Sequence, residues 1–122
     1  MNRETYNAYC ASLLATHHVV QWGDADVWKV AGKVFAIGGR SDTGSLTVTF
    51  KVSALSYDIL KDQPGLRPAP YLASRGMTWI QHFEAPGLND DDMRAYIAES
   101  HRIVAAGLSK KKQREHGLLA EL

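Results

Sequence analysis

The side chains with the clearest chemical meaning in this sequence are lysines and arginines that could bind phosphate groups. Proteins bind nucleic acids partly by neutralising phosphates and releasing their counterions, so clustered basic residues are required. The one basic run is Lys110, Lys111 and Lys112, followed by Arg114. Other basic residues lie in segments that we predict to form a sheet and its loops: Lys29, Lys33, Arg40, Lys51, Arg67 and Arg75. This set suits phosphate contact rather than the reading of base edges.

Each basic group also has a structural explanation. The run Lys110–Lys112 would close a helix, where positive charge is favourable to the macrodipole. Lys29, Lys33 and Lys51 would lie on a solvated sheet face, where lysines discourage edge-to-edge aggregation. The net charge of +1 gives no general reason to expect an acidic partner. Phosphate binding therefore depends on whether the fold groups these residues.

The aromatic side chains are a second candidate, because aromatic rings can stack on unpaired bases. The residues concerned stand inside apolar runs typical of buried strands: Trp22, Trp28, Phe35 and Trp79. We expect Trp79 and Phe35 to pack in the core. Trp28 is open to either interpretation, since Asp26 and Lys29 flank it near a turn.

The sequence offers little support for catalysis or a metal site, and we expect no catalytic residue, no metal and no cofactor. No H-x-x-x-H spacing, phosphate-binding glycine loop or G-x-S-x-G motif occurs. Asp90, Asp91 and Asp92 stand where a helix would begin, and the favourable effect of acidic residues there explains them. The single cysteine, Cys10, lies on an apolar stripe and predicts a buried, inert thiol.

Composition indicates one soluble domain over residues 1–122. Apolar residues make up 45% and charged residues 22% of the chain, as in ordinary globular proteins. No apolar run approaches the roughly 20 residues that span a bilayer. Met1–Thr5 lacks the pattern of a signal peptide, and one cysteine permits no internal disulfide. We expect a cytoplasmic monomer without membrane contact.

The elements that must position these side chains centre on an antiparallel meander over residues 27–51. Its last run alternates, with apolar residues on one face and Thr47, Thr49 and Lys51 on the other. Further strands are predicted at residues 19–22 and 77–83. We predict helices over residues 3–16, which His17 and His18 would end, over 54–61 with Leu55, Ile59 and Leu60 inward, and from Asn89 to 112. We predict a loop over residues 66–76.

This order predicts an α+β domain: an antiparallel β-sheet with helices packed on one face. The chain also resembles the MmcQ/YjbR family of small bacterial proteins. Four stretches carry the resemblance: residues 28–36, 64–68, 77–80 and 99–112. They are similar, in this order, to the family patterns K-V-x-G-K-x-F-A, P-G-V-x-P, x-x-W-V and S-Y-x-L-V-x-x-x-L-P-K-K. The chain departs from the pattern at His101, where the family has Tyr, at Ser109, where it has Pro, and in the placement of Arg75.

The resemblance implies a CyaY-like fold of the double-wing type and a DNA-binding role. Our first hypothesis is a binding module that contacts DNA phosphates through the basic residues on the sheet and the terminal run: Lys29, Lys33, Lys51, Arg67, Arg75, Lys110, Lys111 and Lys112. The alternative is a protein-interaction module that uses the loop from Gly65 to Arg75, with Tyr71 and Trp28 exposed. An enzyme is the weakest of the three hypotheses.

Overall fold

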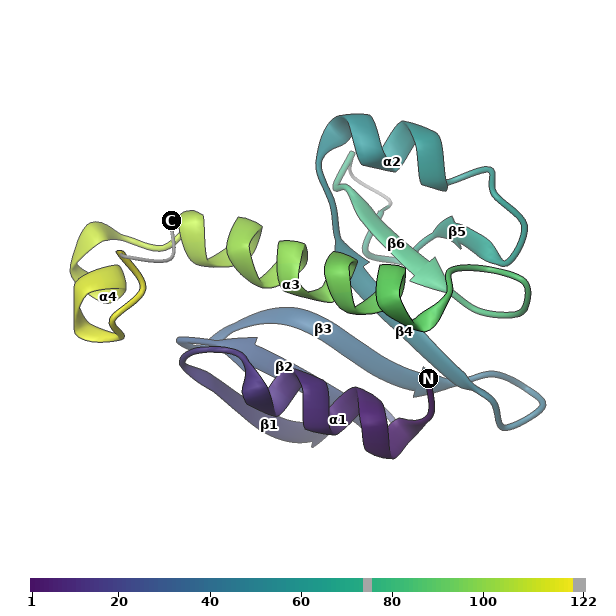
Figure 1. Ribbon diagram of the computed structural model, residues 1–122, viewed down its shortest axis with the longest axis horizontal. Helices are drawn as coiled ribbons and strands as arrows, with labels where there is room; N and C mark the ends of the chain where they lie inside the picture. Colours follow the sequence, from purple (N-terminus) through teal and green to yellow (C-terminus); the bar gives the residue numbers. More distant parts are fainter. Residues whose placement is uncertain (74–75, 120–122) are drawn as a thin grey trace.

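A computed structural model gives the structure, and it describes residues 1–73 and 76–119. The chain begins with one helix and a four-stranded meander, continues with a helix and two short strands, and closes with two helices (Figure 1). The elements are α1 (Arg3–Ser12), β1 (Thr16–Gln21), β2 (Ala25–Val30), β3 (Lys33–Arg40), β4 (Leu46–Lys51), α2 (Ala54–Leu60), β5 (Leu66–Pro68), β6 (Trp79–His82), α3 (Asp90–Ala106) and α4 (Lys110–Glu115).

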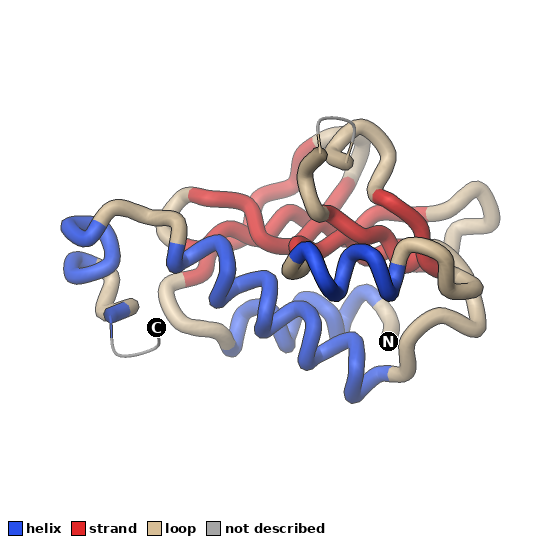
Figure 2. Tube along the Cα trace, turned by 90° about the horizontal axis from the view of Figure 1, so that it is seen from above, coloured by secondary structure: helices blue, strands red, loops and turns tan. Residues whose placement is uncertain are grey.

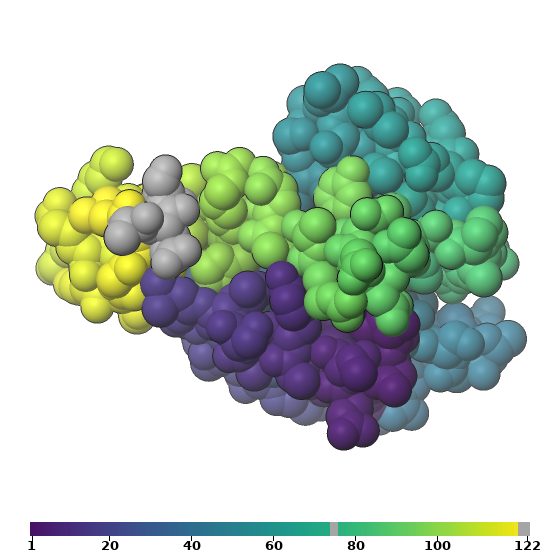
Figure 3. All heavy atoms as spheres, in the orientation of Figure 1, coloured from purple at the N-terminus to yellow at the C-terminus, as the bar shows by residue number. Residues whose placement is uncertain are grey.

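The strands form a single antiparallel sheet in the order β1-β2-β3-β4-β6-β5. Helices α1 and α3 run side by side across one face, and the segment that follows β5 rises on the opposite side (Figure 2). Seen from the helix side, the atoms of α1 and α3 adjoin and cover the meander (Figure 3). The predicted α+β class and the packing of helices on one face are confirmed. We call the covered side the helix face and the other side the open face.

The core lies between the helix face and helices α1 and α3. It is built from the largest fully buried side chains of both layers: Tyr6, Phe35, Phe50, Ile80 and Ile97. Burying each such side chain contributes about 1.5–3 kcal/mol. Gly38 is required at this contact, because a Cβ there would collide with the ring of Tyr6. The expected burial of Phe35 and Trp79 is confirmed.

Ser100 ties α3 to the sheet at the place where β3 and β4 separate. Backbone pairing between these strands stops at Ala36 and Phe50. One step beyond, the Ser100 hydroxyl donates to the Phe35 carbonyl oxygen over 2.6 Å and accepts from the Lys51 N–H over 2.8 Å. A buried side chain thus takes the place of a sheet hydrogen bond, and both backbone groups remain satisfied.

Helix α1 is shorter than we predicted. It ends at Ser12, and the Thr16 hydroxyl lies 3.0 Å from the carbonyl oxygens of Cys10 and Leu13. The side chain therefore satisfies carbonyls that continued helix would have used. His17 and His18 do not end a helix, because both belong to β1.

The predicted C-terminal helix is in fact two helices, α3 and α4. The prediction that the lysine run closes one long helix is therefore wrong. Helix α3 ends before Gly107, and Ser109 caps α4 by accepting from the Lys112 N–H. Gln113 is buried, and its amide donates to the carbonyl oxygens of Ala105 and Leu108 over 3.0 and 3.1 Å. Because Gln113 satisfies carbonyls at the end of α3, the chain can turn there instead of continuing as helix.

Two further predictions fail in the second half of the chain. Residues 66–68 form the edge strand β5 rather than a loop. Leu55 and Ile59 of α2 do not point inward but are exposed, whereas the predicted burial of Leu60 is confirmed.

Candidate open-face site

Strand register places three of the predicted basic residues on the open face. Side chains alternate between faces with period two, and directly paired residues share a face. One row of paired residues therefore crosses the whole sheet: Val19, Val27, Ile37, Thr49, Gln81 and Arg67. Lys29 follows Val27 by two positions on β2, and Lys51 follows Thr49 by two positions on β4, so both share this face.

Arg67 is held in place by its neighbours on this face. Its Nε donates to Gln81 Oε1 over 2.8 Å, and its guanidinium carbon lies 4.4 Å from the centroid of the Phe83 ring. The residue nevertheless remains exposed. A guanidinium that is oriented before binding loses less conformational freedom when it meets a phosphate.

The remaining basic residues lie elsewhere. Lys33 is exposed at the start of β3. The lysine run occupies the first turn of α4, and Lys112 Nζ lies 3.4 Å from the Ala31 carbonyl oxygen in the β2–β3 turn. The run therefore stands at the positive pole of α4, not at the negative pole of a longer helix, so our structural explanation for it was wrong. Arg75 lies outside the described residues.

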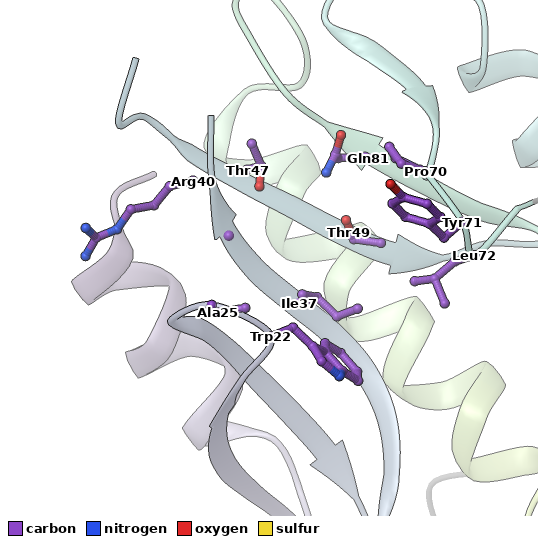
Figure 4. A pocket seen from close by; sticks show the side chains of 12 residues that line it. Trp22, Ala25, Ile37, Arg40, Thr47, Thr49, Pro70, Tyr71, Leu72 and Gln81 are labelled. Carbon is purple, nitrogen blue, oxygen red and sulfur yellow. The ribbon is translucent and has the colours of Figure 1, made fainter. Parts of the chain in front are cut away.

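The open face carries a cavity of about 530 Å³ between the strands and two flanking turns. Ile37, Thr47, Thr49 and Gln81 form its floor, and Trp22 and Tyr71 stand on opposite sides of it (Figure 4). Thr47 and Thr49 are only 6% and 5% exposed. The expected alternation of β4 is thus correct, but these two threonines line a hollow instead of a fully solvated face.

Trp22 and Tyr71 are the most exposed aromatic side chains among the described residues, at 65% and 93%. Both belong to turns and have positive φ values, of 50° and 68°. Trp28, which we expected as an exposed contact, is 7% exposed, and its indole N–H donates to Asn7 Oδ1 over 2.9 Å. Sequence reasoning placed Trp22 inside an apolar run, yet Gly23-Asp24 directly after it is a turn signal that could have marked its exposure.

A second polar cluster lies on the helix face, around the buried carboxylate of Asp26. Arg3 Nε donates to this carboxylate, and His18 Nε2 lies 2.7 Å from it. Burial alone would raise the pKa of Asp26, but hydrogen bonds from Arg3 and His18 and the charge of Arg3 lower that pKa below its ordinary value. These contacts hold α1 against β1 and β2, and this structural role accounts for the cluster.

The single thiol of the chain is not activated. Cys10 is fully buried, and burial raises the pKa of its thiol to about 12, so it stays protonated and weakly nucleophilic. The described part of the chain brings no three His, Cys, Asp or Glu side chains together in a metal-binding arrangement.

In residues 1–73 and 76–119, no helix combines the length and apolar character needed to cross a membrane.

A six-stranded antiparallel sheet with helices on one face and a hollow on the other defines an α+β protein. The YjbR family model matches residues 11–103, and the chain belongs to the YjbR family. The expected family is therefore confirmed. No curated protein matches the chain significantly.

Two solved structures are similar to this fold. The Deinococcus radiodurans protein DR2400, described as a DUF419 domain, superposes with a TM-score of 0.82 at 17% identity, over 96% of this chain and 88% of its own. A protein from Pseudomonas syringae superposes with a TM-score of 0.70 at 20% identity, over 84% of this chain and 98% of its own. At these identities the likeness shows the fold.

Proposed function

We propose that this protein is a cytoplasmic, monomeric binding module, not an enzyme, and that its open face contacts nucleic-acid phosphates. The observation that carries the proposal is the register of the sheet, which sets Lys29, Lys51 and Arg67 on one face. Among the described strand residues of that face there is no Asp or Glu to offset them. A surface of one charge sign raises the local concentration of an anionic ligand.

The basic residues outside this face act as a second, outlying group. Lys33 and the run Lys110–Lys112 lie at the end of the molecule that holds the β2–β3 turn and α4 (Figure 1). They would extend the phosphate contacts of a long strand beyond the sheet. Arg75 belongs to the proposed set by its sequence position alone.

The test is the salt dependence of DNA binding by two matched double variants. Labelled DNA of mixed sequence is titrated at low and moderate salt, and fluorescence anisotropy is measured. Lys29→Ala with Lys51→Ala should weaken binding and reduce the slope of log affinity against log salt by about one per lost phosphate contact. Lys110→Ala with Lys111→Ala removes the same charge from α4 and should have the smaller effect.

Two outcomes would overturn the proposal. Folded wild-type protein that binds no DNA at low salt has no phosphate-contacting face. If the Lys29 and Lys51 variant binds like wild type while the α4 variant does not, the sheet is the wrong surface and the terminal run is the binding element.

A second candidate function is binding of a protein partner. It is favoured by Leu55 and Ile59, which are 72% and 54% exposed and stand one turn apart on α2. Exposed apolar groups at this spacing suit a groove or sheet on another protein. Leu55→Asp with Ile59→Asp should abolish capture of such a partner while DNA binding stays intact. Equal capture by wild type and variant would exclude this surface.

A further inference from the structure

We infer that the open-face cavity takes one unpaired nucleobase of a single strand, stacked against Trp22, so that the module prefers single-stranded to duplex nucleic acid. This inference rests on the proposed function and gives it a ligand class. It concerns a site distinct from the phosphate-contacting residues, because the cavity is lined by aromatic, aliphatic, hydroxyl and amide groups together with Arg40, which is not one of those residues.

The cavity has room for a single flat ring. Its volume of about 530 Å³ lies within the range of small-molecule sites in proteins. Its floor is the surface of the sheet itself, with Ile37 and Thr49 as direct neighbours across β3 and β4. The turn at Trp22 and the segment at Tyr71 stand on either side of this floor (Figure 4). A base held in a duplex cannot enter such a hollow, because its partner and both stacked neighbours surround it.

The exposed indole of Trp22 supplies the stacking surface. The residue has a φ of 50° and is followed by Gly23 at 71°, and this left-handed turn carries the side chain from the end of β1 to the cavity. Aromatic side chains on a sheet surface bind bases of every type, because each base has a π face. An apolar ring that is 65% exposed gains burial when a base covers it.

The polar floor supplies partners for the base edge. Arg67 donates to Gln81 Oε1, which fixes the amide so that its nitrogen faces the floor near Thr49 (Figure 4). Each threonine hydroxyl can donate and accept. Gly39 leaves room for Thr47, since a Cβ at that position would lie 2.9 Å from Thr47 Oγ1. These groups can satisfy the edge of a base that has lost its pairing partner.

The basic residues stand where a strand would leave the cavity. Arg67 is the direct strand partner of Gln81, and Lys51 lies two positions beyond Thr49 on β4. Arg40 belongs to the cavity lining at the end of β3, but its side chain points away from the cavity (Figure 4). A base in the cavity thus places a flanking phosphate on the side of Arg67 and Lys51.

The experiment compares single-stranded and duplex probes with wild type and Trp22 variants. The probes are a fluorescein-labelled oligothymidylate of about 12 nucleotides and its duplex with oligoadenylate, a length within the site size of small single-strand binders. Anisotropy gives the affinity, and quenching of tryptophan fluorescence reports stacking. Wild type should bind the single strand more tightly. Trp22→Ala should weaken this binding about tenfold or more and leave the weaker duplex binding unchanged. Trp22→Phe should retain part of the affinity.

The outcomes separate this inference from the proposed function. Equal binding of both probes, with Trp22→Ala as good as wild type, overturns the base site and leaves phosphate binding in place. Absence of binding to either probe overturns the proposed function itself. Thr49→Val provides an independent check, because it removes a floor hydroxyl without touching the aromatic wall. It should weaken the single-strand affinity only, and an unchanged affinity would remove the polar floor from the site.

Discussion

The two faces of the sheet are built from the same strands but have different roles. Strand β4 contributes to both faces and illustrates the difference. Leu46, Val48 and Phe50 point to the helix face, where the ring of Phe50 stacks on Tyr96 of α3 at 5.6 Å between centroids. Thr47 and Thr49 alternate with them and are almost as well buried, although they line an open hollow. Burial on one face comes from packed helices, and on the other from the walls of a cavity.

The comparison shows that similar burial can have different consequences for stability. On the helix face, apolar atoms meet apolar atoms at close-packed density. On the open face, hydroxyl and amide groups remain within reach of a ligand or of water. We therefore expect substitutions on the helix face to change the free energy of unfolding, and substitutions on the open face to change binding.

The largest effect on the free energy of unfolding is expected from Phe50→Ala. The comparison is Thr49→Val, at the neighbouring position of the same strand. Phe50 is fully buried, so its truncation should lower the free energy of unfolding by about 3–5 kcal/mol through lost burial and a cavity. Thr49→Val preserves shape on the open face and should change that free energy by less than about 1 kcal/mol. Urea denaturation measures both. Comparable losses in the two variants would show that the open face is an ordinary part of the core.

A smaller loss of unfolding free energy is expected from Asp26→Asn, which tests the buried charge on the helix face. The buried carboxylate accepts from Arg3 and His18, and the amide cannot replace both charge-assisted contacts. The variant should lose about 2 kcal/mol of unfolding free energy at neutral pH. Asp58→Asn on α2 is the matched control, because Asp58 is exposed and pairs only at 3.4 Å with Lys61. It should change little.

The pH dependence of the same variant gives the sign of this contribution. The folded-state pKa of Asp26 is lower than the ordinary value of 3.8, so its stabilisation is complete above that value and is lost as pH falls through the folded-state pKa. The difference between wild type and Asp26→Asn should therefore shrink in acid. A difference that stays constant down to low pH would mean that the contribution of Asp26 does not come from its charge.

Much of the fold follows from local pattern. Alternation in residues 46–51 predicts which residues of β4 share each face, and the apolar stripe with Asn89 as its cap predicts the start of α3. The predictions fail where a polar side chain beyond the helix end decides the outcome. Thr16 satisfies the carbonyls that end α1, and Gln113 satisfies those that end α3. Each of these polar residues acts through a side-chain hydrogen bond to the backbone, so helical periodicity does not reveal it.

The candidate site was less accessible to prediction than the fold. Lys29, Lys51 and Arg67 were identifiable as basic residues, but their shared face depends on pairing between β4, β6 and the unpredicted β5. Trp22 stands inside an apolar run but is exposed, and Trp28 was expected as an exposed contact but is buried. For Trp28, a contact between distant residues is again the cause. Trp28 is buried because α1 packs over it and Asn7 accepts its indole N–H, a contact between residues 21 positions apart. A one-dimensional pattern contains no such information.

The smallest effect is expected from Lys110→Glu, at a position that belongs to neither face. Lys110 is the first residue of α4, directly after its cap Ser109, so a negative charge there should favour the helix dipole and raise the unfolding free energy by about 0.3–1 kcal/mol. Lys61→Glu at the C-terminal end of α2 is the opposite case. It should lower stability, because it places an anion at the negative pole and beside Asp58. Urea denaturation at low salt measures both variants. A stabilised Lys110→Glu that also binds DNA less tightly would show that the lysine run is kept for phosphate contact at a cost in helix stability, whereas destabilisation would contradict the position of Lys110 at a helix start.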